Sequence, residues 1–459
     1  MRKSHLLFLT LPALVASCNL EPALDRVESP VSEHYPGNVG GSVSADIAWN
    51  KFIVDPRLKR LVKTALDNNR DLRVAALNVE QLRAQYGITR SALFPTVNVG
   101  ASGQRSRIPG ATNSAGIVTE TRAYDVSVGV AGYEVDIFGR VRSLSHAALQ
   151  EYFASDAARI GVQISLVAQV TNTYFIQRAA LEQIALAEDT LKAVSGTYDL
   201  MNKRFEAGDV SELDLRSVDV QVQTAKAQLA VHQQRLAETN NALALLLGTA
   251  VPSGLPEGRS LEQILVADVR AGVSSELLLR RPDILEAEHH LAAANANIGA
   301  ARAAFFPRLT LTGSAGTASR SLGDLFQDGS GAWSFAPQIS VPIFDGGFNK
   351  ANLDAAQVRK QMEVASYEKA IQTAFREVAD GLVGRTGLNN QIEAYEGLVA
   401  AQAKRFELAD ARYRQGVDSY FEVLTAQQDL FDARQSLIQL RLARAVNSIG
   451  LYKALGGGW

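Results

Sequence analysis

The sequence predicts a chain that combines amphipathic strands with very long helices, arranged as two copies of one plan. Three observations support this fold class. Two regions alternate apolar and polar residues with the period of a strand, most of the remaining chain carries a helical pattern, and residues of the first half recur in the second. With 459 residues, 47% of them hydrophobic, the chain can form a large core. A formal net charge of -2 does not indicate a nucleic-acid partner.

The N-terminus has the layout of a secretory signal peptide. Two basic residues precede an apolar run (6–15) that is too short for a transmembrane helix, and small residues lead to Cys18. An ordinary signal cleaved near Ala16 would leave Cys18 as an incidental thiol. However, Cys18 is the only cysteine, which excludes an internal disulfide framework, and the residues before it resemble the bacterial lipoprotein signal. We therefore expect 1–17 to be a lipoprotein signal peptide.

The lipoprotein resemblance implies a covalent lipid and a destination. Cys18 would become the first residue of the mature protein, carrying an S-diacylglycerol and an N-acyl chain, with no other cofactor expected. Asn19 stands where an aspartate would favour retention in the inner membrane of many bacteria, and it is compatible with sorting to the outer membrane. We expect 18–54 to be a lipid-anchored N-terminal segment.

Four stretches alternate like strands. They lie at about 95–104, 122–137, 308–318 and 332–344, with Val97 and Val99 or Leu309 and Leu311 separated by polar or small residues. A half-buried soluble sheet gives the same pattern as a lipid-facing one. Between Val130 and Tyr133 the apolar phase flips, which predicts a bulge or bend.

Long helices are expected between and after the strands. From about Arg140 to Phe205 there is no proline, and the helix would be roughly 100 Å long at 1.5 Å per residue, so it needs lateral partners. From Ser211 to Leu247 apolar or small residues repeat at spacings of three and four, a heptad seam interrupted only at His232.

The second half repeats the first. Gly87, Arg90, Phe94 and Pro95 correspond to Gly299, Arg302, Phe306 and Pro307, and Gly208, Ser211, Ala225 and Leu229 correspond to Gly416, Ser419, Ala433 and Leu437. We expect a first repeat at 55–250 with a helix–helix turn at 206–211, a linker at 251–273, a second repeat at 274–455 with a turn at 414–419, and a tail at 456–459. A duplication of this kind favours one pseudo-symmetric architecture over several domains.

Three segments resemble a known family. YEVDIFGRVRS at 133–143, RRPDILEAEHHLAAANANIGAARAAFFPRLTLTG at 280–313 and VPIFDGG at 341–347 are similar to the signatures of TolC-like outer membrane factors, specifically their lipoprotein (NodT-type) efflux branch. The resemblance covers essentially the whole mature chain, and RRPDI followed by ARAAFFP is highly specific.

The resemblance implies a homotrimer. Each protomer would supply four strands to one outer-membrane β-barrel of twelve strands and helices to an all-α periplasmic barrel, a tunnel surrounded by an equatorial domain. The implied function is the outer-membrane channel of a tripartite efflux system, which exports drugs, toxic solutes or metals passively. The implied partners are a periplasmic adaptor, an inner-membrane pump and outer-membrane lipid.

The resemblance also assigns roles at the two helix–helix turns. Taken locally, each glycine is a C-cap and each serine the N-cap of the next helix. The resemblance implies that Gly208, Ser211, Gly416 and Ser419 contact the adaptor at the tip of the tunnel, where a missing side chain permits close approach.

The same turns would form the periplasmic gate. The expected gate residues are Asp214, Tyr413, Asp418, Phe421 and Glu422. Many relatives have an aspartate nine residues after the second glycine, and here that place is Thr425, so the usual aspartate ring is in doubt. We expect Phe421 to act as a steric plug with Glu422 or Asp418 nearby, and the carboxylates to favour cations.

Other chemistry-bearing residues favour structural roles. Glu134 and Asp136 share a strand face at the spacing of catalytic carboxylates, but no cleft motif accompanies them. Glu286 and His290 are one helical turn apart, although a solvated helix face is favoured over a metal site. Gly346 and Gly347 indicate a turn from strand into helix. No catalytic constellation supports an enzyme. The remaining alternative is a lipid-anchored periplasmic coiled-coil scaffold without a pore, which would not need amphipathic strands.

Overall fold

The computed structural model describes residues 19–25, 27–32, 35, 48–112, 114, 116–263 and 279–458. Cys18 and the expected signal peptide lie outside the described residues, as does the end of the expected linker. The described residues form two compact units. The first draws on Met1–Glu28, Asn78–Ser155 and Glu286–Tyr367, and the second on Ser29–Leu77, Asp156–Leu285 and Glu368–Trp459.

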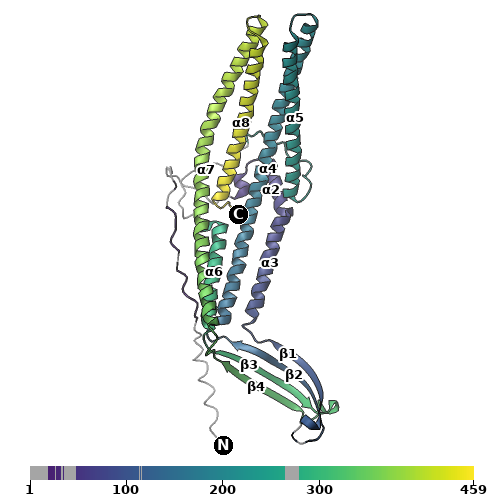
Figure 1. Cartoon of the computed structure of the whole chain (residues 1–459), viewed down its shortest axis with the longest axis vertical. Helices are drawn as coiled ribbons and strands as arrows, with labels where there is room; N and C mark the ends of the chain where they lie inside the picture. The colour runs from purple at the N-terminus through teal and green to yellow at the C-terminus, as the bar shows by residue number, and fades with distance from the viewer. Residues whose placement is uncertain are drawn as a thin grey trace. The chain divides into compact units, whose positions relative to one another are not determined.

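The first unit contains one antiparallel sheet of four strands in the order β1-β2-β3-β4 (Figure 1). The strands are β1 (Val97–Ile108), β2 (Thr119–Val135), β3 (Arg308–Ser319) and β4 (Gly331–Ser340). Short 3-10 helices, Gly110–Thr112 and Leu322–Asp324, lie in the loops that join β1 to β2 and β3 to β4. The outer edges of β1 and β4 have no strand partner among the described residues of this chain.

One face of the sheet is apolar. In one row Val99 pairs with Val128, Val128 with Ala315, and Ala315 with Trp333. Val99 and Trp333 are 78% and 81% exposed, so this chain does not cover the row. The opposite face carries small and polar side chains, for example Ser314 bonded to Ser334 (Oγ to Oγ 2.9 Å). The alternation expected from the sequence is therefore confirmed.

The phase flip in β2 is a β-bulge. The register shifts between Val130 and Tyr133, where Gly132 adopts a φ of +70° and its backbone N–H donates to Thr312 Oγ1 over 3.2 Å. Tyr133 pairs with Leu311, on the same face as Val130 paired with Gly313. The apolar face is therefore continuous across the bulge.

Two strands end elsewhere than the alternation suggested. β1 runs on to Ile108, because the polar residues Gln104 to Ser106 continue the ladder with β2 although they break the apolar pattern. β4 ends at Ser340, and Pro342 follows two residues later, where its ring nitrogen has no N–H to donate to a ladder.

Helices complete both units. Two helices of 67 residues each, α4 (Arg140–Glu206) and α7 (Phe348–Arg414), contribute residues to both. The others are α1 (Trp49–Phe52), α2 (Pro56–Asn68), α3 (Arg70–Ser91), α5 (Glu212–Leu247), α6 (Pro282–Ala303) and α8 (Tyr420–Ala454). None of the helices that the structure describes is long and apolar enough to cross a membrane.

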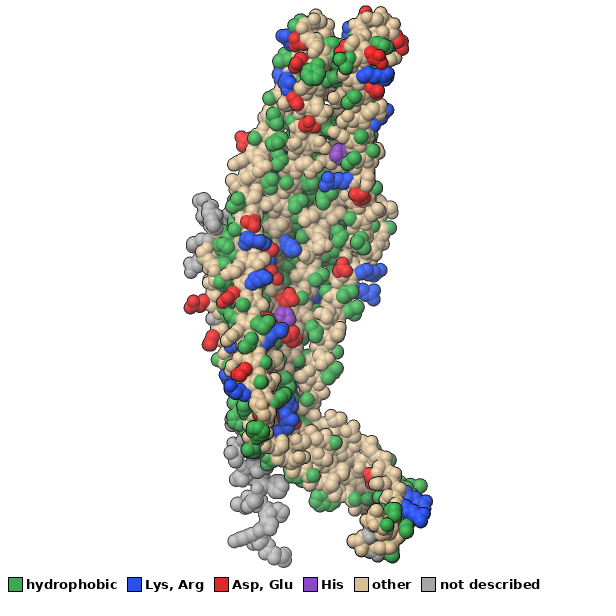
Figure 2. All heavy atoms as spheres, in the orientation of Figure 1, with side chains coloured by type: hydrophobic (Ala, Val, Ile, Leu, Met, Phe, Trp, Pro, Cys, Tyr) green, Lys and Arg blue, Asp and Glu red, His purple; other side chains and the backbone are tan. Residues whose placement is uncertain are grey.

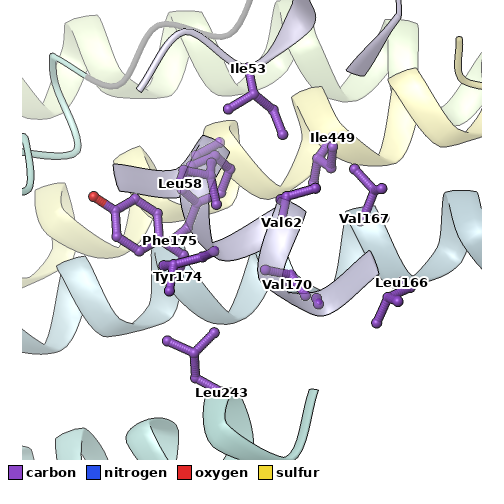
Figure 3. Close-up of a cluster of buried hydrophobic side chains, with 14 of the residues drawn as sticks. Ile53, Leu58, Val62, Leu166, Val167, Val170, Tyr174, Phe175, Leu243 and Ile449 are labelled. Carbon is purple, nitrogen blue, oxygen red and sulfur yellow. The ribbon is translucent and has the colours of Figure 1, made fainter. Parts of the chain in front are cut away.

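The main core of the second unit lies where α2 packs against α4, α5 and α8 (Figure 3). Leu58 of α2 lies beside Tyr174 and Phe175 of α4, Val62 lies beside Ile449 of α8, and all five side chains are fully buried. Asp55 caps α2 by accepting from the backbone N–H of Leu58 (3.1 Å), and it also accepts from the Tyr174 hydroxyl (3.0 Å). One carboxylate therefore joins the short helix to the long one.

The heptad seam of α5 is confirmed. Val218, Val222, Ala225, Leu243 and Leu247 are buried. His232 does not interrupt the seam, since it is itself only 7% exposed. Burial lowers the pKa of His232, so the neutral imidazole fits the seam.

Candidate functional site at the two helix turns

The two glycine turns have the same backbone structure. After α4, the N–H of Gly208 donates to Phe205 (2.9 Å) and that of Asp209 to Arg204 (2.8 Å). After α7, the N–H of Gly416 donates to Tyr413 (2.9 Å) and that of Val417 to Arg412 (3.0 Å). Both sets are Schellman motifs, which end a helix with a left-handed residue. The C-cap interpretation of both glycines is therefore confirmed as local structure.

Backbone conformation, not crowding, requires glycine at both turns. Gly208 and Gly416 have φ values of +82° and +73°, a region that L side chains rarely adopt. A Cβ at either position would meet no atom of the described residues within 4 Å, apart from the glycine's own chain neighbours. The space beside each glycine is open to anything that approaches the turn from outside the protomer.

The helices that follow begin differently. Ser211 forms a full capping box with Asp214, in which Ser211 Oγ accepts from the Asp214 N–H (3.2 Å) and the Asp214 carboxylate accepts from the Ser211 N–H (3.2 Å). Ser419 makes no side-chain cap, and only its carbonyl accepts from Glu422 (3.2 Å). The carboxylate of Asp214 therefore caps the N-terminus of its own helix, α5.

Tyr413 links the two turns. Its hydroxyl accepts from Arg204 Nη1 (2.8 Å) and lies 3.4 Å from Met201 Sδ, both on α4. The Arg204 guanidinium carbon is 6.0 Å from the Tyr413 ring centroid, at the outer limit of a cation–π contact. Tyr413 also packs edge-on against Tyr420 with centroids 5.0 Å apart. The end of α7 is thereby fastened to the end of α4.

A small apolar cluster lies beneath this link. Its buried members come from α4, α5 and α8, namely Met201, Leu215, Val218, Tyr420, Val423 and Leu424. Burial raises the pKa of Tyr420 to about 12. A cavity of about 550 Å³ between the turns is lined in part by Arg204, Asp214, Tyr413 and Ser419. Sequence-predicted residues from both repeats therefore share one cavity.

Asp418 faces the other way. It is held by Arg412, whose Nη2 donates to Oδ1 over 2.9 Å, and this bond holds the pKa of Asp418 below its usual range. Glu422 lines a cavity of about 500 Å³ together with Arg412, Asp418, Lys404 and Arg405. Within the part of the chain that the structure describes, no ion pair engages Glu422. Asp418 is therefore neutralised locally, whereas Glu422 is not.

Phe421 is 69% exposed and has no ring partner among the described aromatic side chains. Its counterpart in the first repeat, Leu213, is 76% exposed. Thr425 donates its hydroxyl to the Phe421 carbonyl of its own helix (2.9 Å). Val417, in the second turn itself, is also 59% exposed, so both turns present apolar side chains to solvent.

Two arginines were missed by reasoning from the sequence. Arg204 and Arg412 both stand four residues before a glycine, so they are equivalent in the repeat. Arg204 binds Tyr413 of the other turn, and Arg412 binds Asp418 of its own turn. Aligning the two repeats identifies the pair, although not the different partners. Figure 2 shows blue and red side chains gathered on both tips.

The remaining candidate residues have structural roles. Glu134 accepts a bidentate pair from Arg140 (2.8 and 2.7 Å), and Asp136 accepts from the backbone N–H groups of Val141 (3.1 Å) and Arg142 (2.8 Å) where α4 begins. The expected turn at Gly346 and Gly347 is confirmed by their φ values of +65° and +89°.

His290 lies between two carboxylates, 3.1 Å from Glu151 and 3.9 Å from Glu286. The hydrogen bond to Glu151 and the negative charge of Glu286 raise the pKa of His290 to about 10. Among the described residues, no group of three or more His, Cys, Asp or Glu side chains is arranged to hold a metal ion.

Known proteins resemble the chain along its length. A family model described as Outer membrane efflux protein matches residues 61–249 and 273–457. The antibiotic efflux pump outer membrane protein ArpC of Pseudomonas putida is 45% identical over 466 residues, 100% of this chain and 96% of the relative. The cation efflux system protein CusC of Escherichia coli O157:H7 is 42% identical over 452 residues, 97% of this chain and 96% of the relative. A solved structure of the open state of the Neisseria gonorrhoeae MtrE outer membrane channel has a TM-score of 0.89 at 41% identity, covering 96% of this chain and 98% of that one.

Proposed function

The chain belongs to the outer membrane efflux protein family and is the outer-membrane component of an efflux system; from that premise we propose that three copies close one continuous channel. In this arrangement the sheets of three protomers form a single barrel of twelve strands, and the long helices form a periplasmic tunnel below it. The channel itself uses no energy, and a pump in the inner membrane drives small solutes through it.

The observation that carries the proposal is the unfinished sheet. Four strands are too few to close a barrel, and the strands at both edges, β1 and β4, are long. Long unpaired edges beside an exposed apolar face are an aggregation hazard in water. In lipid every backbone group must be paired, and joining β4 of one copy to β1 of the next removes all edges. A scaffold without a pore would not need such a sheet.

The turns supply the contact with a periplasmic adaptor. Gly208 and Gly416 carry no side chain on their exposed sides, and the capping residues Ser211 and Ser419 stand three positions beyond them. Backbone is therefore accessible to a partner that approaches each turn. Three protomers present six such turns.

The gate combines a link, a charge and an exposed ring. The Arg204–Tyr413 bond holds α7 to α4, so it opposes separation of the two turns. Glu422, which has no ion pair within the described residues, brings three negative charges near the threefold axis and favours cations. Phe421, exposed in one protomer, is positioned to fill the space near the axis.

A lipid on Cys18 would anchor the mature N-terminus. The residues that follow Cys18 are held on the first unit: the Leu20 carbonyl accepts from Arg302 (3.3 Å), and the Pro22 carbonyl accepts from Asn295 (2.7 Å). The Glu21 carboxylate lies 3.1 Å from Nδ1 of His146. Because these contacts lie within four residues of Cys18, they would hold the lipid attachment point close to the first unit.

The cargo is proposed at the level of chemical class. Relatives are named for export of antibiotics, toluene and cations, and we propose small toxic solutes of this kind for the present chain. Specificity would reside mostly in the pump and adaptor, because a wide polar tunnel need not bind its cargo tightly.

Two measurements test the channel and the docking surface. Trimers purified from outer membranes should conduct ions in planar bilayers. Failure to obtain trimers, or trimers that do not conduct, would refute the proposed channel. Gly416→Trp should abolish export and adaptor crosslinking, whereas Gly416→Asn should retain both, because asparagine tolerates the left-handed conformation without bulk. Gly329→Trp is the matched control, since Gly329 also has a positive φ (+89°) and open space around it. Wild-type crosslinking in Gly416→Trp and Gly208→Trp would end the docking proposal.

A further inference from the structure

The apolar face of the sheet ends in a cluster of charge. On β1 the residues of this face run Val97, Val99, Ala101, Gly103, Arg105 and Arg107, and their partners on β2 run Val130, Val128, Val126, Tyr124, Arg122 and Glu120. Side chains of directly paired residues share a face. The arginines therefore continue the same face that carries the valines, at the end next to the β1–β2 loop. Figure 2 shows blue side chains gathered at this end of the sheet.

The change from apolar to basic residues falls at the expected height of a membrane boundary. On β2 the apolar residues of this face extend from Val135 to Tyr124, and their partners on β3 run from Leu309 to Ser319. The ten steps from 309 to 319 at about 3.3 Å each span roughly 33 Å along β3, or about 25 Å of membrane at a tilt near 40°. That matches the apolar band of an outer-membrane barrel. Tyr124, packed over Gly103, stands where barrels carry an aromatic girdle.

Arg105 and Arg122 lie one paired row beyond Tyr124. A lipid-facing arginine is costly at the bilayer midplane and nearly free at the interface, so this height is compatible with arginines that face lipid headgroups. The proposed function places the helices in the periplasm, which makes this end of the sheet the one that faces the outer leaflet.

The cluster is not balanced by its own carboxylate. Arg105 and Arg122 are directly opposite each other, and like charges in that position destabilise a sheet. Both approach the same oxygen of Glu120, at 3.0 and 3.9 Å. Arg107 has no ion pair among the described residues. Only two of the three guanidinium groups therefore reach a carboxylate, and it is the same one; the side chains of Arg105 and Arg122 are 61% and 50% exposed.

We propose that Arg105, Arg107 and Arg122 form a binding site for the phosphate groups of the outer-leaflet glycolipid, lipopolysaccharide. Guanidinium forks match phosphate oxygens, and a phosphate would offset the repulsion between the paired arginines. Acyl chains of the same lipid would cover the valine rows below. The inference rests on the proposed function, because it requires this face to lie in the outer membrane.

Native mass spectrometry of the full-length trimer tests the site with three probes: lipid A bearing both phosphates, chemically dephosphorylated lipid A, and phosphatidylglycerol. One cation near an anionic lipid surface changes affinity about fivefold, so Arg105→Gln/Arg107→Gln/Arg122→Gln should weaken lipid A binding about 100-fold. Glu120→Gln should instead tighten it, because it removes the competing carboxylate. Arg83→Gln, which removes a 66% exposed arginine paired with Glu80 on α3, should leave binding unchanged.

The triple arginine variant and Glu120→Gln are expected to change lipid A binding in opposite directions. If the ion pairs with Glu120 were only structural, lipid A binding would fall in both variants. Equal binding of lipid A to wild type and triple variant, or binding of either control lipid as tight as that of lipid A, would overturn the inference. Conductance of the same preparations is measured separately. Absence of wild-type conductance bears on the channel, whereas equal lipid binding by conducting trimers bears on this site alone.

Discussion

The Tyr413 hydroxyl is the smallest group whose removal should loosen the tip. It accepts from Arg204 over 2.8 Å in a half-buried setting, so Tyr413→Phe removes a hydrogen bond to a charged donor and keeps the ring. Such bonds contribute about 1.5–3 kcal/mol when buried, and partial exposure reduces this to about 1 kcal/mol. In the proposed trimer the three copies of this bond add to about 3 kcal/mol, so their loss would shift the equilibrium between closed and open tips about 150-fold toward open.

Single-channel recording in planar bilayers measures that shift as the fraction of time spent in the high-conductance state. Thr425→Ala is the matched control, because it also removes one hydroxyl near the tip, but that hydroxyl bonds only to its own helix (2.9 Å to the Phe421 carbonyl). Tyr413→Phe should raise the open fraction and sensitise cells to large antibiotics. Equal open fractions in Tyr413→Phe and Thr425→Ala would refute the assignment of the Arg204–Tyr413 bond as a closing contact.

Three further outcomes follow from the same geometry. Glu422→Gln should reduce the preference of the channel for cations, whereas Asp418→Asn should change it less, because Arg412 already neutralises Asp418. Reversal potentials in a salt gradient measure this preference, and unchanged selectivity in both variants would contradict the charge assignment. Gly248→Ala should lower the free energy of unfolding by well over the ~1 kcal/mol expected from its positive φ, because a Cβ would overlap the Asn68 carbonyl oxygen. Gly254 also has a positive φ but open space around it, so Gly254→Ala should lower the free energy of unfolding by only about that amount, as measured by thermal unfolding. His290 has a folded pKa raised to about 10, so its stabilisation should be complete below its unfolded pKa near 6.5 and should disappear as pH rises through about 10; a pH-independent difference in unfolding between wild type and His290→Gln would contradict the ion pairs with Glu151 and Glu286.

The strands and long helices were predictable because their signals are local and repeated. Alternation along Val97 to Ala101 reports a one-sided environment, and the absence of proline between Arg140 and Glu206 permits one helix. The extension of β1 from Arg105 to Ile108 was not predictable in this way. Those residues follow no apolar pattern, and their strand conformation depends on backbone pairing with β2.

At the candidate site, conformation was easier to predict than partnership. A glycine followed three positions later by a serine indicates a cap and a new helix from local chemistry alone. The bond between Arg204 and Tyr413 joins residues 209 apart in the sequence, and it depends on how the two turns pack. Asp214 was expected at the gate, yet its carboxylate serves a capping box, and the same residue type supports both interpretations.

The bulge in β2 has a consequence for how strand length can change. Deleting one residue from a regular strand exchanges its two faces, and the valines beyond the deletion would move from the apolar face to the polar face. At Ala131-Gly132 the opposite holds, because β2 takes three steps from Val130 to Tyr133 where β3 takes two from Gly313 to Leu311. Loss of Gly132 would restore a regular ladder and keep every side chain on its present side. A deletion at that point would therefore leave each side chain of β2 on the same face of the sheet and would remove only the bend.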